Sequence, residues 1–499
     1  MLAIWFQIAW KEWREHVWKM IAVAAIALSI EGYLIVNYPA EGGQAFLASL
    51  SLVPGAVFIA MGVAAGERTA GSLDFLRSLP IGLWKWAVAR LLAGAVAVLM
   101  PLSFVVLLQL IAGRPARGDV PDLGQGITIV GLICLSVYLW TVAVGVERSS
   151  ELRAGVAAVC LFVGWLALAM AVFSLGVFFL PSLRPVYGIV VVLSPVGAVR
   201  LGDARAGLGV WQVALLQVLT LAGLTWWSVR RYGRLVPSDD RSPAATRPDR
   251  LAPAALRPSR RSPLVAMVWK EYREAKPICV AGLVIIGALT LPSLIGLAGE
   301  LGTQALRQAA GVIAFLGTLM ALVLGVGGHA GDLHPGVWQF WRSRPIATAG
   351  WFWIKYLTGA TVLLATFEGA TTAIDLLAGW PGTVVRDPVW WCGPVFHLLA
   401  YSLAVWMVCQ LRQPIYAGIL SLGLLISVAI LGDYPFPKPY LPWLSFNNVI
   451  RLAPEPDDSF PVFLGWLTDT YLPFAATMIG LSLFFTLLGW AAVRRVEAR

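Results

Sequence analysis

Apolar residues in this chain are grouped in runs of about 20, and short polar segments separate the runs. A helix of roughly 20 apolar residues crosses the hydrocarbon core of a bilayer, and a backbone in lipid has to be helical because unpaired N–H and C=O groups are costly there. The pattern therefore predicts an all-α, polytopic membrane protein with about twelve transmembrane helices. The expected spans lie near 18–37, 45–65, 87–112, 127–146, 156–180, 211–229, 277–297, 309–328, 351–378, 390–409, 415–431 and 471–493.

A short amphipathic segment precedes the first span of each half, at 3–17 and at 264–276. We call these two stretches the leading segments. In the first of them Ile4 can face lipid while Lys11 and Glu12 face water, so we expect helices that lie in the membrane interface. The residues that mark the leading segments are Trp10, Lys11 and Glu12 in the first half, and Trp269, Lys270 and Glu271 in the second.

Residues 234–263 interrupt the apolar pattern with arginines set among proline, alanine and serine. Such a stretch cannot bury apolar surface, and we expect it to be a flexible or extended linker. The chain then divides into a first six-helix unit at 1–233, the linker, and a second six-helix unit at 264–499.

Composition agrees with this picture, because 59% of the residues are hydrophobic and 13% are charged, with a mean hydropathy of +0.77. An ordinary soluble protein carries about 25% charged residues. The net charge of +10 could indicate nucleic-acid binding, but the arginines lie between the apolar runs, as the positive-inside bias of membrane proteins requires. We therefore expect membrane lipids around the chain, no nucleic-acid partner, and both termini and the linker on the cytoplasmic side.

Polar landmarks of the first half recur about 260 positions later in the same order. Residues 10–15 (WKEWRE) return as 269–274 (WKEYRE), and residues 75–81 (FLRSLPI) return as 340–346 (FWRSRPI). Chance similarity between apolar helices would not reproduce polar landmarks in order, so we infer that the chain arose by tandem duplication of a six-helix unit. Six spans per copy start both copies on the same membrane face, which predicts parallel repeats with a pathway between them.

The recurring loop at 67–81 and 332–346 combines apolar and charged positions around a short helix that a proline ends. Either the loop is an ordinary amphipathic turn on the bilayer surface, or it is a docking element for a soluble partner. Recurrence in both halves favours docking. The candidate residues are Glu67, Gly71, Phe75, Leu76, Arg77 and Pro80 in the first half, and Asp332, Gly336, Phe340, Arg342 and Pro345 in the second.

Acidic residues inside the expected spans are few, and they are Glu31, Glu368 and Asp375. Intramembrane carboxylates are candidates for a substrate pathway because burying them is expensive. Glu368 and Asp375 are seven residues apart and so share one helical face. All three lie in the outer part of their spans, where we expect water to be close.

Enzyme and nucleotide motifs are missing from the sequence. There is no Gly-x-x-x-x-Gly-Lys-Ser/Thr loop to hold ATP phosphates, and neither His-Glu-x-x-His nor Gly-x-Ser-x-Gly occurs. We expect no catalytic residues, no bound cofactor and no metal site in this chain.

The leading Trp-Lys-Glu segments, the six-span units and above all the loop from Glu67 to Ile81 resemble the permease subunits of type-2 ABC transporters, which include many bacterial exporters. The resemblance covers 1–233 and 264–499. It implies an exporter in the bacterial cytoplasmic membrane, energised by a separate soluble ATPase that binds ATP and Mg²⁺ and docks on the loop. It also implies that this chain alone supplies the whole membrane domain, with extracytoplasmic or re-entrant helices around 181–210 and 432–470.

The second copy departs from the pattern, with Asp332, Trp341 and Arg344 where the first copy has Glu67, Leu76 and Leu79. Its contact with an ATPase is expected to be weaker or asymmetric.

Two other readings stay open. A secondary transporter of the major facilitator type also has twelve spans in two halves, but its usual Gly-x-x-x-Asp-Arg/Lys-x-Gly-Arg-Arg loop does not match residues 67–71 here. A membrane-embedded enzyme for lipid-linked substrates would need carboxylates or histidines clustered at one membrane face, and the sequence shows no such cluster.

Overall fold

The structure is a computed structural model of the whole chain, and it describes sixteen stretches of the sequence. Within them every regular element is helical and none is a strand, which confirms the all-α class for this part of the chain. The described residues are 2–37, 52–69, 82–111, 123–148, 151–178, 184–195, 197–198, 210–234, 263–295, 313, 317–333, 347–369, 372, 388–433, 449 and 460–497. The linker predicted at 234–263 therefore lies almost entirely outside them.

The helices of the first half follow the predicted apolar runs closely. They are α1 (Leu2–Asn37), α3 (Leu52–Thr69), α5 (Leu83–Ile111), α6 (Leu123–Gly145), α7 (Glu151–Phe178), α8 (Arg184–Leu193) and α9 (Val210–Tyr232). Gly233 comes directly after α9 and its N–H donates to the Val229 carbonyl, so this helix ends on a glycine, the residue favoured at that place.

The second half contains a matching series. Its elements are α11 (Pro263–Ile295), the apolar helix Gly317–Ala330, α14 (Thr348–Leu363) with the π-helical turn η5 (Leu364–Glu368), α17 (Pro388–Leu411), α18 (Pro414–Asp433), α20 (Phe460–Trp466), the π-helical turn η7 (Leu467–Tyr471) and α21 (Leu472–Glu497). The short helices α8 and α20 fall inside the two segments for which the family resemblance implied extra helices.

Five helices are long and apolar enough to cross a membrane by length and composition, within the part of the chain that the structure describes. They are Leu83–Ile111, Gly126–Gly145, Trp211–Tyr232, Cys392–Leu411 and Pro461–Arg495, and four shorter apolar helices accompany them. The predicted total of about twelve spans stays a prediction.

The leading segments are not separate helices. Helix α1 runs without interruption through both the expected interfacial stretch at 3–17 and the expected span at 18–37, and α11 does the same in the second half. The junction in the first half carries no glycine or proline that would stop a helix, so the helical hydrogen bonding continues across it. In the second half α11 continues through Pro277, which stands at the junction. Each leading segment is the first part of a long helix that continues into the bundle.

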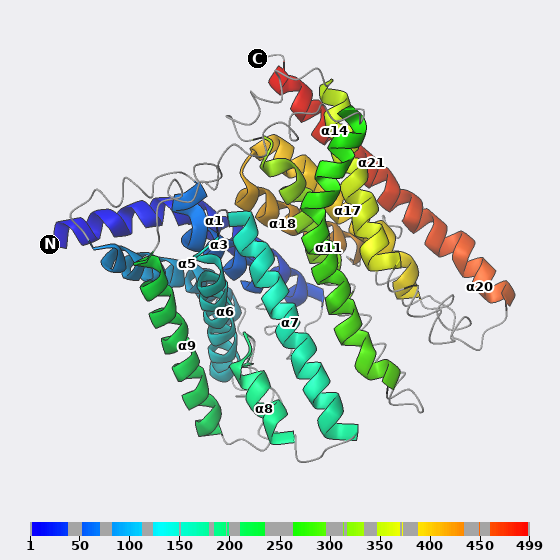
Figure 1. Cartoon of the computed structure of the whole chain (residues 1–499). Coiled ribbons are helices and arrows are strands. Elements are labelled where there is room, and N and C mark those ends of the chain that lie inside the picture. The colour runs from blue at the N-terminus through cyan, green and yellow to red at the C-terminus, as the bar shows by residue number, and fades with distance from the viewer. Residues whose placement is uncertain are drawn as a thin grey trace, which may run out of the picture.

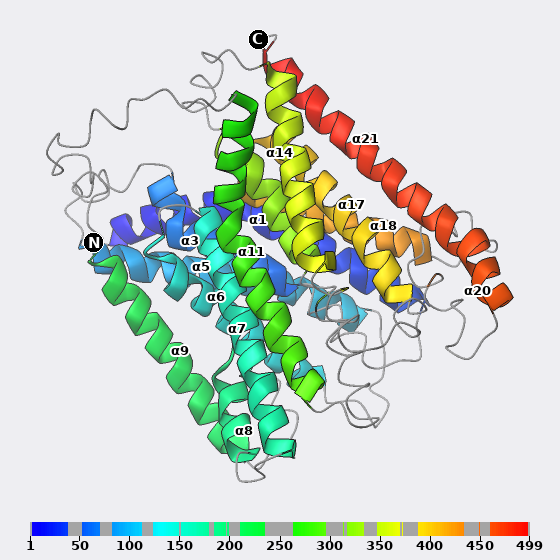
Figure 2. The same ribbon diagram turned by 45° about the vertical axis from the view of Figure 1, so that its right-hand side comes forward.

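Packing within each half follows the same order. In the first half α1 packs on α5, α6 packs on α7 and α9, and α5 also contacts α6 and α9. In the second half α11 packs on α14, α17 packs on α18 and α21, and α14 also contacts α17 and α21 (Figure 2). The described residues form two large hydrophobic cores, one centred on α3 and α6 and the other on α14 and α17. Ile415 and Ile419 of α18 join the first core, and Val159 of α7 joins the second.

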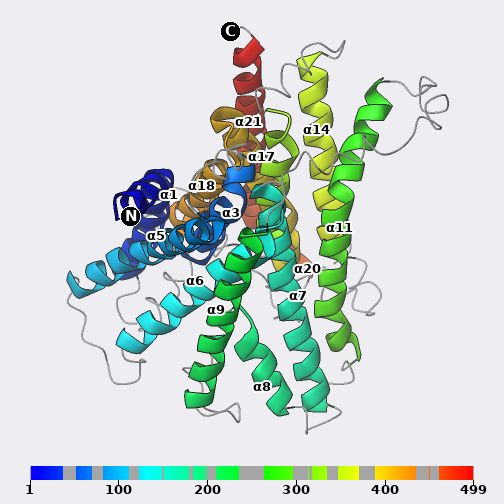
Figure 3. The same ribbon diagram turned by 60° about the vertical axis from the view of Figure 1, so that its left-hand side comes forward.

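The two halves meet through reciprocal contacts between their first and fifth long helices. Helix α7 lies beside α11 and runs in the same direction (Figures 1 and 3), while α1 lies beside α18. Helices α7 and α18 also touch each other. A contact between two elements that is repeated with the partners exchanged is the mark of a two-fold arrangement.

Candidate functional site: two buried ion-pair clusters

Four charged residues from α1, α3 and α5 meet at the base of the first recurring loop. The Lys11 ammonium pairs with the Glu67 carboxylate, and the Arg90 guanidinium lies 3.4 Å from Glu12 and 3.2 Å from Glu67. Glu12 is fully buried, and Arg90 is 1% exposed. We call Lys11, Glu12, Glu67 and Arg90 the first cluster.

Arg90 is held by more than its two carboxylates. Its Nη1 donates a 3.1 Å hydrogen bond to the Tyr232 hydroxyl at the end of α9, and its Nη2 donates a 2.9 Å bond to the Gly62 carbonyl on α3. Buried charges in proteins are stable only when they are paired and hydrogen-bonded, because leaving water is costly. Arg90 therefore joins α1, α3, α5 and α9 at one point.

Electrostatics in the leading segment favour the ionised forms of Glu12 and Lys11. Burial alone would raise the pKa of Glu12, but the Arg90 charge acts against it together with His16 and Lys11, and the pKa of Glu12 is lowered. Burial would lower the pKa of Lys11, whereas the hydrogen bond and charge of Glu67 raise it. His16 lies one turn beyond Glu12, with its Nε2 at 3.6 Å from that carboxylate, and burial lowers the pKa of His16.

The second half contains a cluster of the same design at the base of its own loop. Lys355 of α14 lies 2.9 Å from the Glu271 carboxylate of α11 and 2.8 Å from Asp332, and its ammonium donates a 2.6 Å bond to the Gly328 carbonyl. Lys270 lies 3.3 Å from Asp332 and 3.5 Å from Glu271. Burial would raise the pKa of Asp332, but Lys355 lowers it. Lys270, Glu271, Asp332 and Lys355 form the second cluster.

The members of the two clusters occupy matching places in the repeat. Lys11 and Glu12 correspond to Lys270 and Glu271, Glu67 corresponds to Asp332, and Arg90 corresponds to Lys355. In each half one acid comes from the leading segment, one from the start of the recurring loop, and the cation between them from the helix that follows the loop.

A second set of contacts recurs one turn deeper in the bundle. The Tyr138 hydroxyl donates to the Leu91 carbonyl over 2.9 Å, and the Tyr401 hydroxyl donates to the Tyr356 carbonyl over 3.1 Å. A glycine lies opposite each hydroxyl, and a Cβ there would collide with the tyrosine. These glycines are Gly94 and Gly359.

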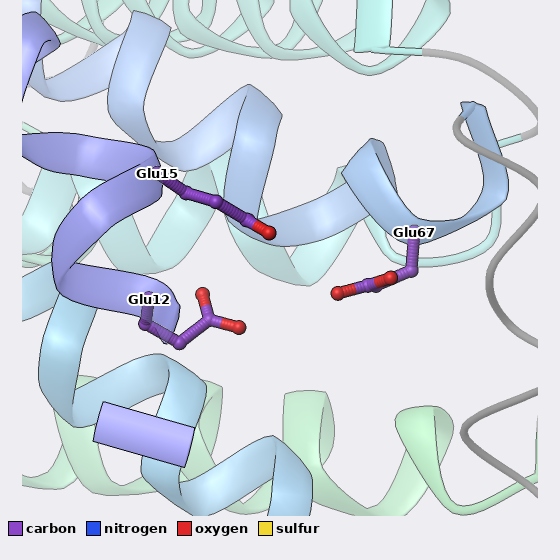
Figure 4. Close-up of side chains that lie close together, drawn as sticks. All are labelled: Glu12, Glu15 and Glu67. Carbon is purple, nitrogen blue, oxygen red and sulfur yellow. The ribbon is translucent and has the colours of Figure 1, made fainter. Parts of the chain in front are cut away.

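Three carboxylates of the first half, on Glu12, Glu15 and Glu67, approach one another within 4.8 Å (Figure 4). Such a group could hold a metal ion, but Lys11 lies 3.4 Å from Glu15 and also pairs with Glu67, and Arg90 bridges Glu12 and Glu67. Each of the three acids thus already has a cation of the chain as a partner. We interpret the group as an ion-pair network.

The structure corrects the expected orientation of the leading segments. Glu12 and Glu271 are buried instead of facing water, because each supplies a carboxylate to its cluster. Trp10 and Trp269, in contrast, are 55% and 52% exposed, as an interfacial position requires. The leading segments therefore present Trp10 and Trp269 outward and Glu12 and Glu271 inward.

Sequence reasoning missed Arg90 and Lys355, the cations at the centre of the two clusters. The signal was present, because Trp86 stands four residues before Arg90 as Trp351 stands four residues before Lys355. A cation that recurs at the same place in two matching apolar helices indicates a buried acidic partner on a neighbouring helix.

Most of the predicted docking loop lies outside the described residues. Of the predicted docking residues only Glu67 and Asp332, where the loops begin, are described, and each belongs to a cluster. The other predicted docking residues are not described: Gly71, Phe75, Leu76, Arg77, Pro80, Gly336, Phe340, Arg342 and Pro345.

Two of the three acids that were predicted to lie inside spans have partners in neighbouring helices, and Asp375 lies outside the described residues. Glu31 is buried and accepts a 3.1 Å hydrogen bond from Gln109 of α5. Contrary to the expectation from the sequence, Glu31 is therefore not close to water. Glu368, at the end of η5, lies 2.5 Å from Nδ1 of His397 on α17, a histidine that the sequence did not single out.

Comparison with known proteins shows no match, either with a protein-family model or with a curated protein sequence.

Proposed function

We propose that the chain is the membrane permease of an ABC-type exporter, built from two parallel six-helix units with about twelve spans. Both termini lie in the cytoplasm of a bacterial cell, and a separate soluble ATPase binds ATP and Mg²⁺. The observation that carries the proposal is that each recurring loop rises from a buried ion-pair cluster tying it to the leading segment.

The first cluster would allow the loop to transmit force to the helices around it. Glu67 lies near the end of α3, Arg90 lies two turns into α5, and the loop spans the interval between these helices. Their ion pair fixes the two ends of the loop to each other, and Glu12 adds α1. Separating a buried ion pair costs about 3–5 kcal/mol. A push on the loop would therefore move α1, α3 and α5 as one body.

The matched clusters and the reciprocal contacts between halves support two equivalent units on a common face. Helix α1 packs on α18 as α11 packs on α7, the relation expected when a two-fold axis relates the halves. A single chain with both units could form a whole translocation path between them, and each unit would offer one loop to an ATPase.

The halves are matched but not identical, which fits asymmetric coupling. In the first cluster Arg90 also binds Tyr232 and joins α9, whereas the second cluster has Lys355 and is more exposed to solvent. Arginine has five donors and lysine has three, so the first loop is anchored to more of the bundle.

Purification from the native membrane tests the proposal. We expect a tagged chain in mild detergent to retain a soluble ATPase with Mg²⁺-dependent ATP hydrolysis. Leu76→Asp, which places a charge in the apolar part of the loop, should release that subunit. Arg14→Gln, an exposed change in the leading segment, should not.

Loss of the ATPase from the unmodified chain, or full retention by the Leu76→Asp variant, would contradict the proposal. Transport in vesicles that runs on a proton gradient without ATP would instead support the secondary-transporter reading.

A further inference from the structure

The last long helix of each half ends in an arginine that lies over a tryptophan ring one turn earlier. The guanidinium carbon of Arg230 is 5.0 Å from the centre of the Trp226 ring on α9, and that of Arg494 is 4.7 Å from the centre of the Trp490 ring on α21. The two pairs are separated by the spacing of the repeat, about 260 positions, and both arginines are exposed. The same arrangement therefore occurs once in each half.

Helices α9 and α21 lie at the periphery of the bundle, and Figure 2 shows them on opposite sides of the molecule. Of the five described helices that could span a membrane, these two have the smallest shares of buried residues in their apolar parts, 17% and 33%. Their inner faces are packed, with Gln217 and Tyr232 of α9 and Phe474 and Met478 of α21 buried. In the part of the chain that the structure describes, no element covers their outer faces.

An apolar stripe runs along the outer face of α9 and leads to Arg230. Trp211, Leu215, Leu219 and Trp226 follow one another at intervals of four or seven residues, which places them on one face of the helix. Their exposed fractions are 87%, 60%, 58% and 60%. From Trp211 to Arg230 the helix rises about 28 Å, close to the roughly 30 Å of hydrocarbon in a bilayer. Arg230 therefore lies at the level of the lipid headgroups when the stripe lies among acyl chains.

Helix α21 has an equivalent stripe that leads to Arg494. Leu472, Ile479, Leu483 and Leu487 follow one another at intervals of seven or four residues, and all four are exposed. Each half thus combines a surface suited to acyl chains with a cation at one end of that surface.

Both arginines lack an acidic partner. Among the described residues neither Arg230 nor Arg494 forms an ion pair with a carboxylate, whereas the neighbouring Arg231 pairs with Glu147. A guanidinium that lies over an aromatic ring uses its face for that contact, and its N–H groups remain available in the plane of the group. Such a fork of donors matches two oxygens of a phosphate. The charge and the donors of Arg230 and Arg494 are therefore available to an anion.

We propose that Arg230 and Arg494 each bind the phosphate of an anionic phospholipid whose acyl chains lie along the apolar stripe before the arginine. The phosphate oxygens accept hydrogen bonds from the guanidinium, and the negative charge of the lipid compensates an arginine that has no acid of its own. A zwitterionic lipid carries its own cation and compensates the arginine less. The tryptophan ring holds the guanidinium at the headgroup level. This binding requires a membrane and no ATPase, so it is independent of the proposed permease function.

Arg412 supplies a matched control. It is exposed, and it follows Cys392–Leu411, the most buried of the five candidate spans at 67%. Arg412→Gln therefore removes the same charge as Arg230→Gln or Arg494→Gln, but at the end of a helix that has few exposed apolar residues to hold an acyl chain.

Native mass spectrometry of the purified full chain in detergent tests the two sites, with phosphatidylglycerol as the anionic lipid and phosphatidylcholine as the zwitterionic one. We expect two molecules of phosphatidylglycerol to bind about fivefold more tightly than phosphatidylcholine, since one arginine beside an anionic lipid contributes about a factor of five. Arg230→Gln and Arg494→Gln should each remove one of the two tightly bound molecules, and the double variant should bind both lipids equally. Arg412→Gln should bind lipid as the unmodified chain does. Glycerophosphoglycerol, the same headgroup without acyl chains, should not compete.

Equal affinity of the unmodified chain for the two lipids would overturn the proposal. An equal loss in the Arg412→Gln variant would also overturn it, because the preference would then come from diffuse attraction to surface charge. Displacement of the lipid by glycerophosphoglycerol would assign the arginines to soluble phosphates. A dimer of the purified chain that Leu219→Asn splits into monomers would assign the stripe of α9 to a second copy, and it would overturn the proposal for that helix.

Discussion

Replacement of Arg90 by methionine tests the first cluster at its centre. Methionine keeps much of the side-chain volume and removes the charge. Glu12, fully buried, would lose the cation 3.4 Å away, while Glu67 would keep Lys11. Leaving one buried partner of an ion pair uncompensated costs about 3–5 kcal/mol. The lost hydrogen bonds to Tyr232 and Gly62 act in the same direction.

We expect Arg90→Met to lower the free energy of unfolding by about 4 kcal/mol, dominated by the orphaned Glu12. The measurement is SDS titration of the purified protein in mixed micelles, followed by tryptophan fluorescence. The double variant Arg90→Met with Glu12→Gln should recover about 2 kcal/mol or more, because no buried charge is then left without a partner.

A control at Arg14 separates this effect from a general loss of positive charge. Arg14 is exposed on the same leading segment, and Arg14→Met should change the free energy of unfolding by less than about 0.5 kcal/mol. An Arg90→Met protein as stable as the Arg14→Met protein would refute the reasoning. A double variant no more stable than Arg90→Met would refute it as well.

Three further outcomes follow from the paired architecture. Lys355→Met should lower the free energy of unfolding by about half as much as Arg90→Met in the same titration, because Lys270 still reaches both acids of the second cluster. An equal or larger loss of stability would contradict this expectation. Tyr138→Phe and Tyr401→Phe should each lower the free energy of unfolding by about 1 kcal/mol, since each removes one buried hydrogen bond. Clearly unequal losses in the two variants would argue against the equivalence of the two halves. Arg90 is the largest of the influences that lower the pKa of Glu12, so Glu12 stabilises the wild type above about pH 4 and this stabilisation is lost on acidification. In Arg90→Met burial is opposed only by His16 and Lys11 and should raise that pKa, so stability should increase as the pH falls from 7 to 5.

The helical content could be predicted from the sequence because it follows from local pattern. Helix α5 (Leu83–Ile111) and α17 (Pro388–Leu411) agree with the predicted spans within a few residues, since long apolar runs leave few alternatives. The continuity of α1 was missed because a change from polar to apolar residues suggested a boundary. A helix ends at capping and breaking residues, and a change in polarity alone does not end it.

The inward direction of Glu12 could not be predicted from the leading segment alone. A charged residue beside apolar ones normally faces water, and the Arg90 that reverses this preference belongs to a helix far along the chain. Long-range pairing of this kind leaves no trace in local periodicity. The repeat could have revealed it, because Arg90 and Lys355 are matched in position and charge.

For the pair of Glu368 and His397, too, the sequence predicted one residue and the tertiary structure revealed the other. The acid stood out in the sequence because carboxylates are rare in apolar spans. Its partner did not, since a histidine in an apolar helix is ordinary until a carboxylate is found beside it. The tertiary contact between η5 and α17 supplies that information.

The central claim is that the two recurring loops form one docking face for an ATPase. The most direct measurement is site-specific photo-cross-linking in native cells from Leu76 and from Trp341, the matched positions of the two loops. We expect both positions to cross-link to the same soluble polypeptide, mass spectrometry to identify that polypeptide as a P-loop ATPase, and ATP to change the cross-linking yield. Cross-linking of both positions to lipid alone, or to different proteins without a nucleotide site, would contradict it.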